Sequence, residues 1–533
     1  MKKFLLIFIV ALCLSALLAI TSFGAETTFS GSYRIRSHNE VNFDKEVRDI
    51  GNVITHDQPL TSSWFEQRFR LTITHTRSEY LKAVVRMDLV EDTWGQGRAF
   101  TMNNVSDDYI DLAYIEFTLP KIGTFTAGLF DEEYGHGLTI SRGRAPSSFL
   151  GFSGVRWKNA WGPVTVSALY AKEWDSANIP IFTAFGNLYN ADTDLFTLDV
   201  KVIPVEDHTL ELYGGYYRQR IATPAFGIFP SIYSTRRSAT MINYNPNVFT
   251  SNLIVRDATV GFVGAAYNGT IFDMIDIKGE YTHFFGTAEA YNSLLFPTYS
   301  TFVSGGLPTQ LLPSKDVDLR GYNLYVDVSF FTDLFRVGVA FLMGSGQDHQ
   351  WNSYSLDRMN VNAFALNDGL TWGTILVPGD YEFMNTPLPL TWGTENLTSI
   401  KLYFEVCPME NLSIRGAAIW AKWTKPVGYA TPFNNFDLTA RGGYVNSKAS
   451  GYVHPMTSFG NYDYDSWNVS TDLGWEFDLG FSWQIMEGLT FSCDAGVLLT
   501  GDSFDYARWN GTSFVREEWG PIWRVVNSLT YEF

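Results

Sequence analysis

The chain has 533 residues, of which 46% are hydrophobic and 16% aromatic, and its formal net charge is −18. So acidic a chain lacks the basic patches that nucleic-acid binding needs, and we expect no nucleic-acid partner. Beyond the start of the chain there is no run of about 18 apolar residues, which argues against a helical membrane domain.

The first segment has the pattern of a secretory leader. Met1-Lys2-Lys3 is basic, Phe4 to Ile20 is apolar, and Ser22-Phe23-Gly24 offers small residues before Ala25. We therefore predict a signal peptide over residues 1–24 that is cleaved from the mature protein. A membrane anchor is the rival interpretation, but the apolar run is at the short limit for spanning a bilayer.

Residues 25–533 are dominated by segments in which apolar and polar side chains alternate. Within 473–485, for example, Leu473, Trp475 and Phe477 share one face, and Glu476 and Asp478 share the other. Such a two-residue period is typical of a strand between lipid and water. We predict strands near 27–36, 64–76, 81–90, 109–119, 123–131, 154–160, 163–172, 194–203, 208–218, 255–267, 271–285, 319–330, 335–343, 398–407, 412–424, 473–485, 488–500 and 523–533.

The connections between these strands alternate in length. Short links are predicted at 77–79, 120–122, 160–162, 204–207, 268–270, 331–334, 408–411 and 486–487. Long links are predicted at 37–63, 91–107, 132–153, 173–193, 219–254, 286–318, 344–397, 425–470 and 501–522. This parity indicates an all-β fold: a single transmembrane antiparallel β-barrel of about 18 strands, or 16, with long extracellular loops and short periplasmic turns.

The end of the chain supports the same fold. Leu529, Tyr531 and Phe533 form the alternating, aromatic-ended pattern of a closing strand in bacterial outer-membrane barrels. We therefore expect the outer membrane of a Gram-negative bacterium, with both termini periplasmic. The expected partners are outer-membrane lipid, lipopolysaccharide and the barrel-assembly machinery, which would contact the C-terminal strand.

The inward faces of the predicted strands carry both signs of charge. The predicted pore-lining basic residues are Arg34, Arg36, Arg68, Arg70, Lys82, Arg86, Arg156 and Lys158. The predicted pore-lining acidic residues are Glu66, Asp88, Glu116, Asp472, Glu476, Asp478 and Asp494. Two interpretations stay open: ion pairs that hold the shape of the wall, or a transverse field that orders polar or anionic solutes.

Several other residues are candidates for special roles. We expect the long loops 344–397 and 425–470 to be ordered, with one or both folding into the lumen. Trp372 and Trp392 are expected to pack within the loop or join an interfacial girdle, with sugar stacking as the alternative. His136 has no nucleophile pattern beside it, and Cys407 and Cys493 lie on separate predicted strands as buried or lipid-facing thiols. We expect no enzyme activity, cofactor or metal site.

Several short motifs occur within and after the predicted strands. They are Ala113-Tyr114-Ile115-Glu116-Phe117, Leu119-Pro120, Gly123, Gly128-Leu129-Phe130 and Tyr134-Gly135-His136-Gly137-Leu138, with a Gly-Ser-Gly-containing strand exit over Leu342–Asp348. These motifs resemble the alginate-export family of outer-membrane barrels and related porins. The resemblance implies a monomeric barrel of about 18 strands. Leu129-Phe130 stands where that family commonly has Arg-Gln, so the role of that Arg is not carried over.

These observations predict a porin-like channel for passive diffusion of small hydrophilic solutes, which include anionic and carbohydrate solutes as candidates. Two alternatives stay open. One is an exporter of an anionic polysaccharide, and the other is a barrel that sheathes a partner protein such as a cytochrome or lipoprotein. An aqueous lumen follows from the strand count, because a barrel this wide is not filled by its own wall side chains.

Overall fold

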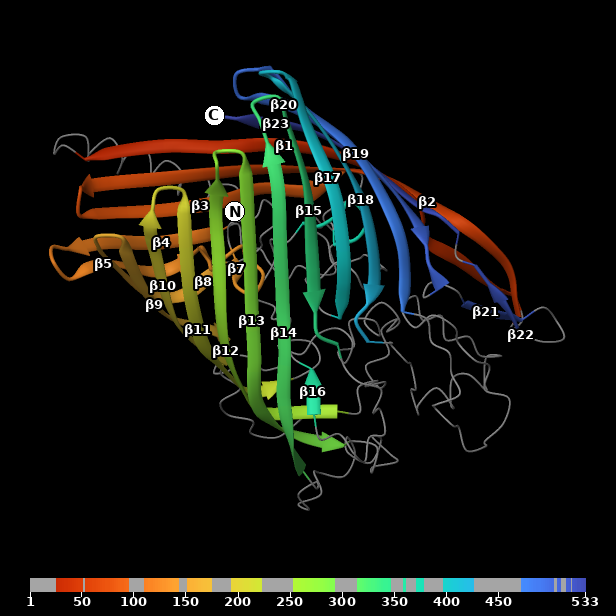
Figure 1. Cartoon of the computed structure of the whole chain (residues 1–533), viewed down its shortest axis with the longest axis horizontal. Coiled ribbons are helices and arrows are strands. Elements are labelled where there is room, and N and C mark those ends of the chain that lie inside the picture. Colours follow the sequence, from red (N-terminus) through yellow and green to blue (C-terminus); the bar gives the residue numbers. More distant parts are fainter. Residues whose placement is uncertain are drawn as a thin grey trace, which may run out of the picture.

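The computed structural model describes residues 25–50, 53–94, 110–142, 151–174, 193–222, 253–292, 314–346, 358–360, 371–377, 396–425, 471–502, 506–509, 514–518 and 520–533. These residues form a closed antiparallel β-barrel of 18 strands (Figure 1). The prediction of about 18 strands is confirmed, and the alternative of 16 is wrong. The predicted leader lies outside the described residues.

The barrel strands follow one another around the wall in chain order. They are β1 (Glu26–Ile50), β2 (Val53–Ser78), β3 (Leu81–Thr93), β4 (Ile110–Leu119), β5 (Gly123–Phe130), β8 (Phe152–Trp161), β9 (Val164–Trp174), β10 (Thr193–Val205), β11 (His208–Ala222), β12 (Leu253–Ile271), β13 (Ile275–Asn292), β14 (Ser314–Phe331), β15 (Phe335–Gly344), β17 (Leu397–Met409), β18 (Leu412–Trp423), β19 (Asp472–Met486), β20 (Leu489–Thr500) and β23 (Ile522–Glu532).

Five short strands lie outside this series. β6 (Glu132–Glu133) pairs with β7 (Ser141–Arg142), β21 (Tyr506–Trp509) pairs with β22 (Phe514–Glu517), and β16 (Arg358–Asn360) runs parallel to β14. Among the described residues, the structure contains no helix with the length and apolar character needed to cross a membrane.

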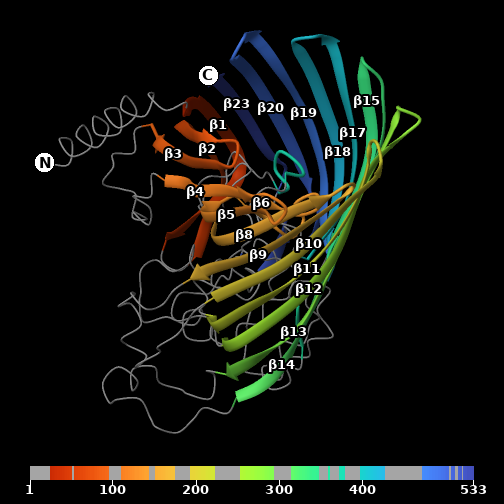
Figure 2. The same cartoon turned by 90° about the vertical axis from the view of Figure 1, so that its left-hand side faces the viewer.

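The barrel closes where the last strand meets the first. β23 pairs with β1 from Ser32 opposite Glu532 to Val41 opposite Trp523, and Figure 2 shows the two strands side by side. Closure satisfies the backbone hydrogen bonds of every barrel strand on both sides, which is the condition for a sheet to cross a bilayer.

The short turns lie at one end of the barrel, as Figure 1 shows for the turns after β12, β17 and β19. The turn predicted at 268–270 is wrong, because β12 continues to Ile271 and the chain turns over residues 272–274. Phe272 and Asp273 have φ of 55° and 56°. Two left-handed residues suit the twist of a tight hairpin, although neither is the glycine or asparagine that usually signals one.

The long link predicted over 37–63 is also wrong. β1 continues to Ile50 and β2 begins at Val53, so most of that range forms a hairpin that extends the first two strands. Register shifts after Val41 and Arg48 interrupt the pairing there. Polar Ser37 and Asn39 occupy the next outward positions of β1 after Ile35, which explains why the sequence pattern ended before the first shift.

The outer face of the barrel is apolar and exposed. Side chains of alternate residues project outward, among them Leu198, Leu212, Val263, Leu402 and Leu479, which are 52–60% exposed. An exposed apolar band around a closed barrel is the surface that lipid covers.

One predicted outward residue faces inward instead. Leu473 is 1% exposed and belongs to a hydrophobic cluster inside the barrel. The register of β19 shifts against β18 between Ala421 and Lys422, and Gly474 has a φ of +100°. This bulge turns Leu473 to the inner face, while Trp475 and Phe477 keep the predicted outward direction.

Candidate functional site in the barrel lumen

The basic residues of the first two strands lie next to one another on the inner wall. Arg36 on β1 bonds Glu66 on β2, and both side chains are about nineteen-twentieths buried. Arg34 stands opposite Arg68 in the β1–β2 register, and Arg68 is buried. This part of the predicted basic track is therefore packed into the wall with a predicted acidic residue.

A second group of charges joins β2, β3 and β4. Arg70 Nε donates to Asp88 Oδ1 at 2.7 Å, and its Nη2 lies 3.1 Å from Asp111 Oδ2. Arg86 also bonds Asp111, a buried residue that the sequence analysis did not select. Two guanidinium groups thus share two carboxylates across three strands.

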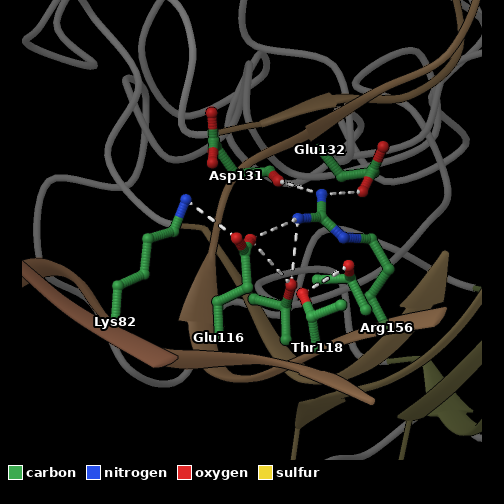
Figure 3. Close-up of polar contacts among 8 residues, drawn as sticks. Lys82, Glu116, Thr118, Asp131, Glu132 and Arg156 are labelled. Carbon is green, nitrogen blue, oxygen red and sulfur yellow. Dashed lines mark hydrogen bonds and ion pairs between the residues drawn. The ribbon is translucent and has the colours of Figure 1, made fainter. Parts of the chain in front are cut away.

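Figure 3 shows a third group, in which a wall arginine reaches a segment inside the lumen. Lys82 Nζ lies 2.8 Å from Oε1 of Glu116, and Oε2 of the same carboxylate lies 3.9 Å from Arg156 Nη2. Arg156 Nη1 donates to Glu132 on β6 at 2.5 Å. Lys158, two residues farther along β8, is exposed.

The predicted acidic residues of the last strands have different surroundings. Glu476 on β19 is fully buried, and Asp478 is half-buried beside it. Asp494 on β20 accepts from Arg415 on β18 at 2.6 Å. Asp472, the first residue of β19, is exposed and accepts from the backbone N–H of Gly474 at 3.1 Å.

The chain from Asp131 to Arg142, here called the first inward segment, folds into the lumen, and Figure 2 shows its strand β6 inside the curve of the wall. The N–H of Gly135 donates to Glu211 on β11 at 2.8 Å. The N–H groups of His136 and Leu138 both donate to Glu280 Oε2 on β13, at 2.6 and 3.4 Å. Inward carboxylates therefore hold the main chain of this segment.

Glycine is required at the centre of the first inward segment. Gly135 has a φ of +60°, and a Cβ added there would lie 2.6 Å from Glu280 Oε2. Tyr134 beside it is 1% exposed and bonds Thr197 on β10. Around it pack other apolar side chains of the inner wall, including Phe130, Ile140, Phe152, Leu195, Phe262 and Phe284.

A second inward segment is formed by Thr371–Val377, which is part of the predicted loop 344–397. The N–H groups of Ile375 and Leu376 donate to the two oxygens of Glu476 at 2.6 and 2.8 Å. The carbonyl of Trp372 accepts from Lys401 at 2.6 Å, and that of Thr374 accepts from Arg524 at 2.7 Å. The expectation that this loop enters the lumen holds for these seven residues.

Trp372 packs inside the barrel rather than in a girdle. It is 3% exposed, and its indole N–H donates to Ser399 at 2.8 Å. Trp392, the other tryptophan of the repeated Leu-Thr-Trp-Gly-Thr sequence, lies outside the described residues. So does most of the predicted loop 425–470.

The two inward segments meet over one wall residue, Tyr325 of β14. Its ring centroid lies 5.5 Å from that of His136 and 6.4 Å from that of Trp372. Leu138 of the first segment belongs to the same hydrophobic cluster as Trp372 of the second. The two inward segments therefore meet inside the lumen at this level.

His136 is an ionisable side chain of the first inward segment at this junction. Burial lowers the pKa of its imidazole below the ordinary value, although a hydrogen bond from its ring to the carbonyl of Tyr267 opposes the shift. Lys278 lowers the same pKa, whereas Glu211 and Glu133 raise it. The ring is therefore neutral at neutral pH.

Sequence reasoning missed a buried cluster at the closure of the barrel. Arg524 on β23 is 1% exposed and its Nε lies 3.3 Å from Glu40 Oε1 on β1. His38, also buried, stacks on Trp64 with centroids 4.7 Å apart and lies 3.2 Å from Glu66. Arg524 lies between the outward residues Trp523 and Val525 of β23, so the two-residue period of this strand would have placed it on the inner face. Glu40 and His38 fell within the wrongly predicted loop.

Within the described ranges, no group of three or more His, Cys, Asp or Glu side chains is arranged to hold a metal ion. Cys407 on β17 and Cys493 on β20 are both free and half-buried.

No family model and no curated protein matches the chain. Similar solved structures include two Pseudomonas aeruginosa proteins. OccK11 (OpdR) is 11% identical with a TM-score of 0.44, covering 95% of this chain and 96% of that one. OpdL is 10% identical with a TM-score of 0.44, and the match covers 95% of this chain and 99% of OpdL. A loop L8 deletion mutant of the Vibrio cholerae outer-membrane protein OmpT is 11% identical with a TM-score of 0.36, and the match covers 96% of this chain and 99% of that protein.

Proposed function

We propose that this protein is a porin-like channel of the outer membrane through which small hydrophilic solutes diffuse passively. The observation that carries the proposal is the exposure of inward charged side chains near the end of the barrel that has the short turns. The side chains of Lys82, Lys201 and Arg415 are 39%, 45% and 43% exposed there, and Asp494 is 32% exposed. Water therefore reaches charged groups of both signs on the inner wall.

The two inward segments would set the size limit of the channel. They narrow the lumen at the level of Tyr325, where inward groups such as Glu280, Glu476 and Arg524 are buried. Lumen charges and constricting segments are the features by which barrel channels select solutes. Solutes small enough to pass beside His136 and Lys401 would be the natural cargo.

The predicted pore-lining residues are proposed to act as a mixed-charge wall. Guanidinium groups have five N–H donors, so an arginine paired with one carboxylate can still donate to a passing solute. If Arg68 and Arg70 face that solute, charge reversal to Glu at both positions should shift ion preference toward cations in a bilayer under a salt gradient. An unchanged reversal potential would remove them from the pathway.

The membrane setting is part of the same proposal. Outward Trp523 and Tyr531 on β23 are 52% and 48% exposed, with Val525 and Leu529 on the same face between them, which suits aromatic girdles at two lipid boundaries. Both termini and the short turns would be periplasmic, and lipopolysaccharide would surround the loop end. Cleavage of residues 1–24 and recognition of the C-terminal strand by the barrel-assembly machinery complete the proposal.

The structure favours neither alternative function. A barrel that sheathes a partner needs a free lumen, whereas two segments of this chain meet inside it at Tyr325. An exporter of an anionic polysaccharide needs inward cations without carboxylate partners, whereas Arg36, Arg70, Arg86 and Arg156 each contact a carboxylate. The exposed inward cations Lys82, Lys201 and Arg415 also lie beside carboxylates. The proposal includes no catalytic step.

A solute-flux assay tests the proposal. Liposomes that contain the refolded barrel are placed in iso-osmotic solutions of neutral sugars and small organic ions of increasing size. The proposal predicts swelling with small solutes and a sharp loss of swelling as size increases. Absence of swelling with every solute, from barrels that remain folded by circular dichroism, would reject passive diffusion.

A further inference from the structure

The apolar outer face has a polar interruption where the barrel closes. Ser37 on β1, Gln67 on β2 and Asn527 on β23 lie on the outward faces of their strands, between apolar neighbours such as Ile35 and Leu529. All three polar side chains are half-buried. We call them the seam patch.

The seam patch lies at the middle of the lipid-facing band. The outward residues of β23 run Trp523, Val525, Asn527, Leu529 and Tyr531, so Asn527 is midway between two exposed aromatic residues. The distance between those aromatic residues is roughly 26 Å along the strand at about 3.3 Å per residue, or roughly 20 Å along the membrane normal for a strand tilted by about 40°, which is most of the height of a barrel's apolar band. The amides are therefore placed far from both interfaces.

The hydrogen bonds of the seam patch leave both donors and acceptors unused. Asn527 Nδ2 donates to Ser37 Oγ at 3.1 Å, and Gln67 Oε1 accepts from the Tyr33 hydroxyl at 2.9 Å. Among the described residues, the Nε2 group of Gln67 and the Oδ1 atom of Asn527 make no hydrogen bond. One amide thus offers free N–H groups, and the other offers a free carbonyl oxygen.

Lipid chains cannot satisfy these groups. Hydrocarbon offers no hydrogen-bond partner, so an unsatisfied amide at this depth is destabilising unless a protein covers it. Polar side chains that form hydrogen bonds between membrane segments are a recurrent cause of association in bilayers. The seam patch therefore has the chemistry of a protein–protein contact within the membrane.

We propose that the seam patch is the centre of an interface with a second copy of this chain. A two-fold axis through the patch would bring Gln67 Nε2 of one copy against Asn527 Oδ1 of the other, and the reverse pair would form by symmetry. The patch supplies the donor and the acceptor in equal number, which is the condition for an isologous contact. Exposed Phe65 and Leu529 beside it would pack across the same interface.

The oligomeric state tests this inference. The full-length protein is extracted in mild detergent, and the protein mass of the particle is measured by light scattering, with single-channel conductance read from the same samples. The wild type should have the mass of two chains. Replacing both amides, N527L with Q67L, should give the mass of one chain with unchanged conductance per barrel. A matched control, S153L on the outward face of β8, should remain a dimer.

Cross-linking in native membranes adds a second measurement. In a background that carries C407S and C493S, a thiol-reactive cross-linker should join copies carrying S37C but not copies carrying L212C on the far wall. A wild type with the mass of one chain, or a dimer that survives the double amide replacement, would overturn the inference. So would capture of a different protein by the thiol of the S37C variant. Loss of conductance alone would count against the channel proposal and not against this interface.

Discussion

At the scale of single residues, two glutamates on different parts of the wall perform the same task. Glu280 accepts two main-chain N–H groups of the first inward segment, and Glu476 accepts two of the second. Parity in the sequence predicted that Glu476 faces inward. Its partner, a main-chain segment about 100 residues away, could not be predicted, because nothing in a strand pattern identifies which loop returns to it.

Replacement of Glu476 by Gln should loosen the second inward segment. Both oxygens of Glu476 accept a hydrogen bond, one from the N–H of Ile375 and one from that of Leu376. The amide group of Gln would place its own N–H donors against one of these two N–H groups. The expected loss is that of a buried hydrogen bond left unmade, about 1–3 kcal/mol. Single-channel recording should show larger and noisier openings. The control E405Q, whose side chain accepts from Ser413, should conduct like the wild type; equal conductance in both variants would contradict this role for Glu476.

Replacement of Gly135 by Ala should displace the first inward segment. The left-handed φ costs an L-residue about 1–2 kcal/mol, and the new methyl group would also collide with Glu280. Gly162 is the matched control, because its φ is +57° but a Cβ there has nothing within 4 Å. Thermal melting should show a larger loss for G135A than for G162A. Equal losses would mean that the contact with Glu280 is unimportant.

The neutral imidazole of His136 should make the constriction sensitive to acid. Because its pKa is lowered in the folded segment, protonation favours the displaced segment, in which the pKa returns to about 6.5. The first inward segment is therefore fully stable in its position inside the lumen above that pH, and this position loses stability as the pH falls below it. Conductance should increase between pH 7 and pH 5, and less so in H136Q. Identical pH profiles would exclude His136 as the cause.

At the scale of elements, alternation located the strands because lipid constrains one face of each. The strands from β17 to β20 begin and end within two residues of their predictions, since most of their outward residues are apolar. Polar Ser37 and Asn39 interrupt the apolar outward face of β1, and the pairing with β2 shifts register after Val41, so the extension of β1 and β2 over 37–63 was missed. The bulge at Gly474 also escaped prediction, because one inserted residue leaves the composition of the strand unchanged.

The charges shared by β2, β3 and β4 lead to a test of selectivity. Asp111 contacts both Arg70 and Arg86, so D111N would leave two guanidinium groups with one nearby carboxylate fewer. The reversal potential under a salt gradient should shift toward anions. D318N removes the same charge from an exposed side chain that bonds Arg320 and should leave the potential unchanged. A shift of equal size in both variants would show that only net charge matters.

At the scale of the whole molecule, closure and constriction come from different sources. Closure follows from local pattern, and the sequence predicted it through the parity of links and the aromatic final strand. The constriction depends on contacts such as that of His136 with Tyr325, which join residues far apart in the chain. The candidate site was therefore only half predicted: the inward charges were identified, but not the main-chain segments that they hold.

A channel narrowed by the two inward segments is tested most directly by single-channel current in a planar bilayer, comparing the wild type with a variant that combines G135A and E476Q. We expect discrete small openings in the wild type and clearly larger openings in the variant, because both inward segments would be displaced from the lumen. A folded wild-type barrel that conducts no current, or two proteins with the same conductance, would contradict a water-filled channel narrowed by these segments.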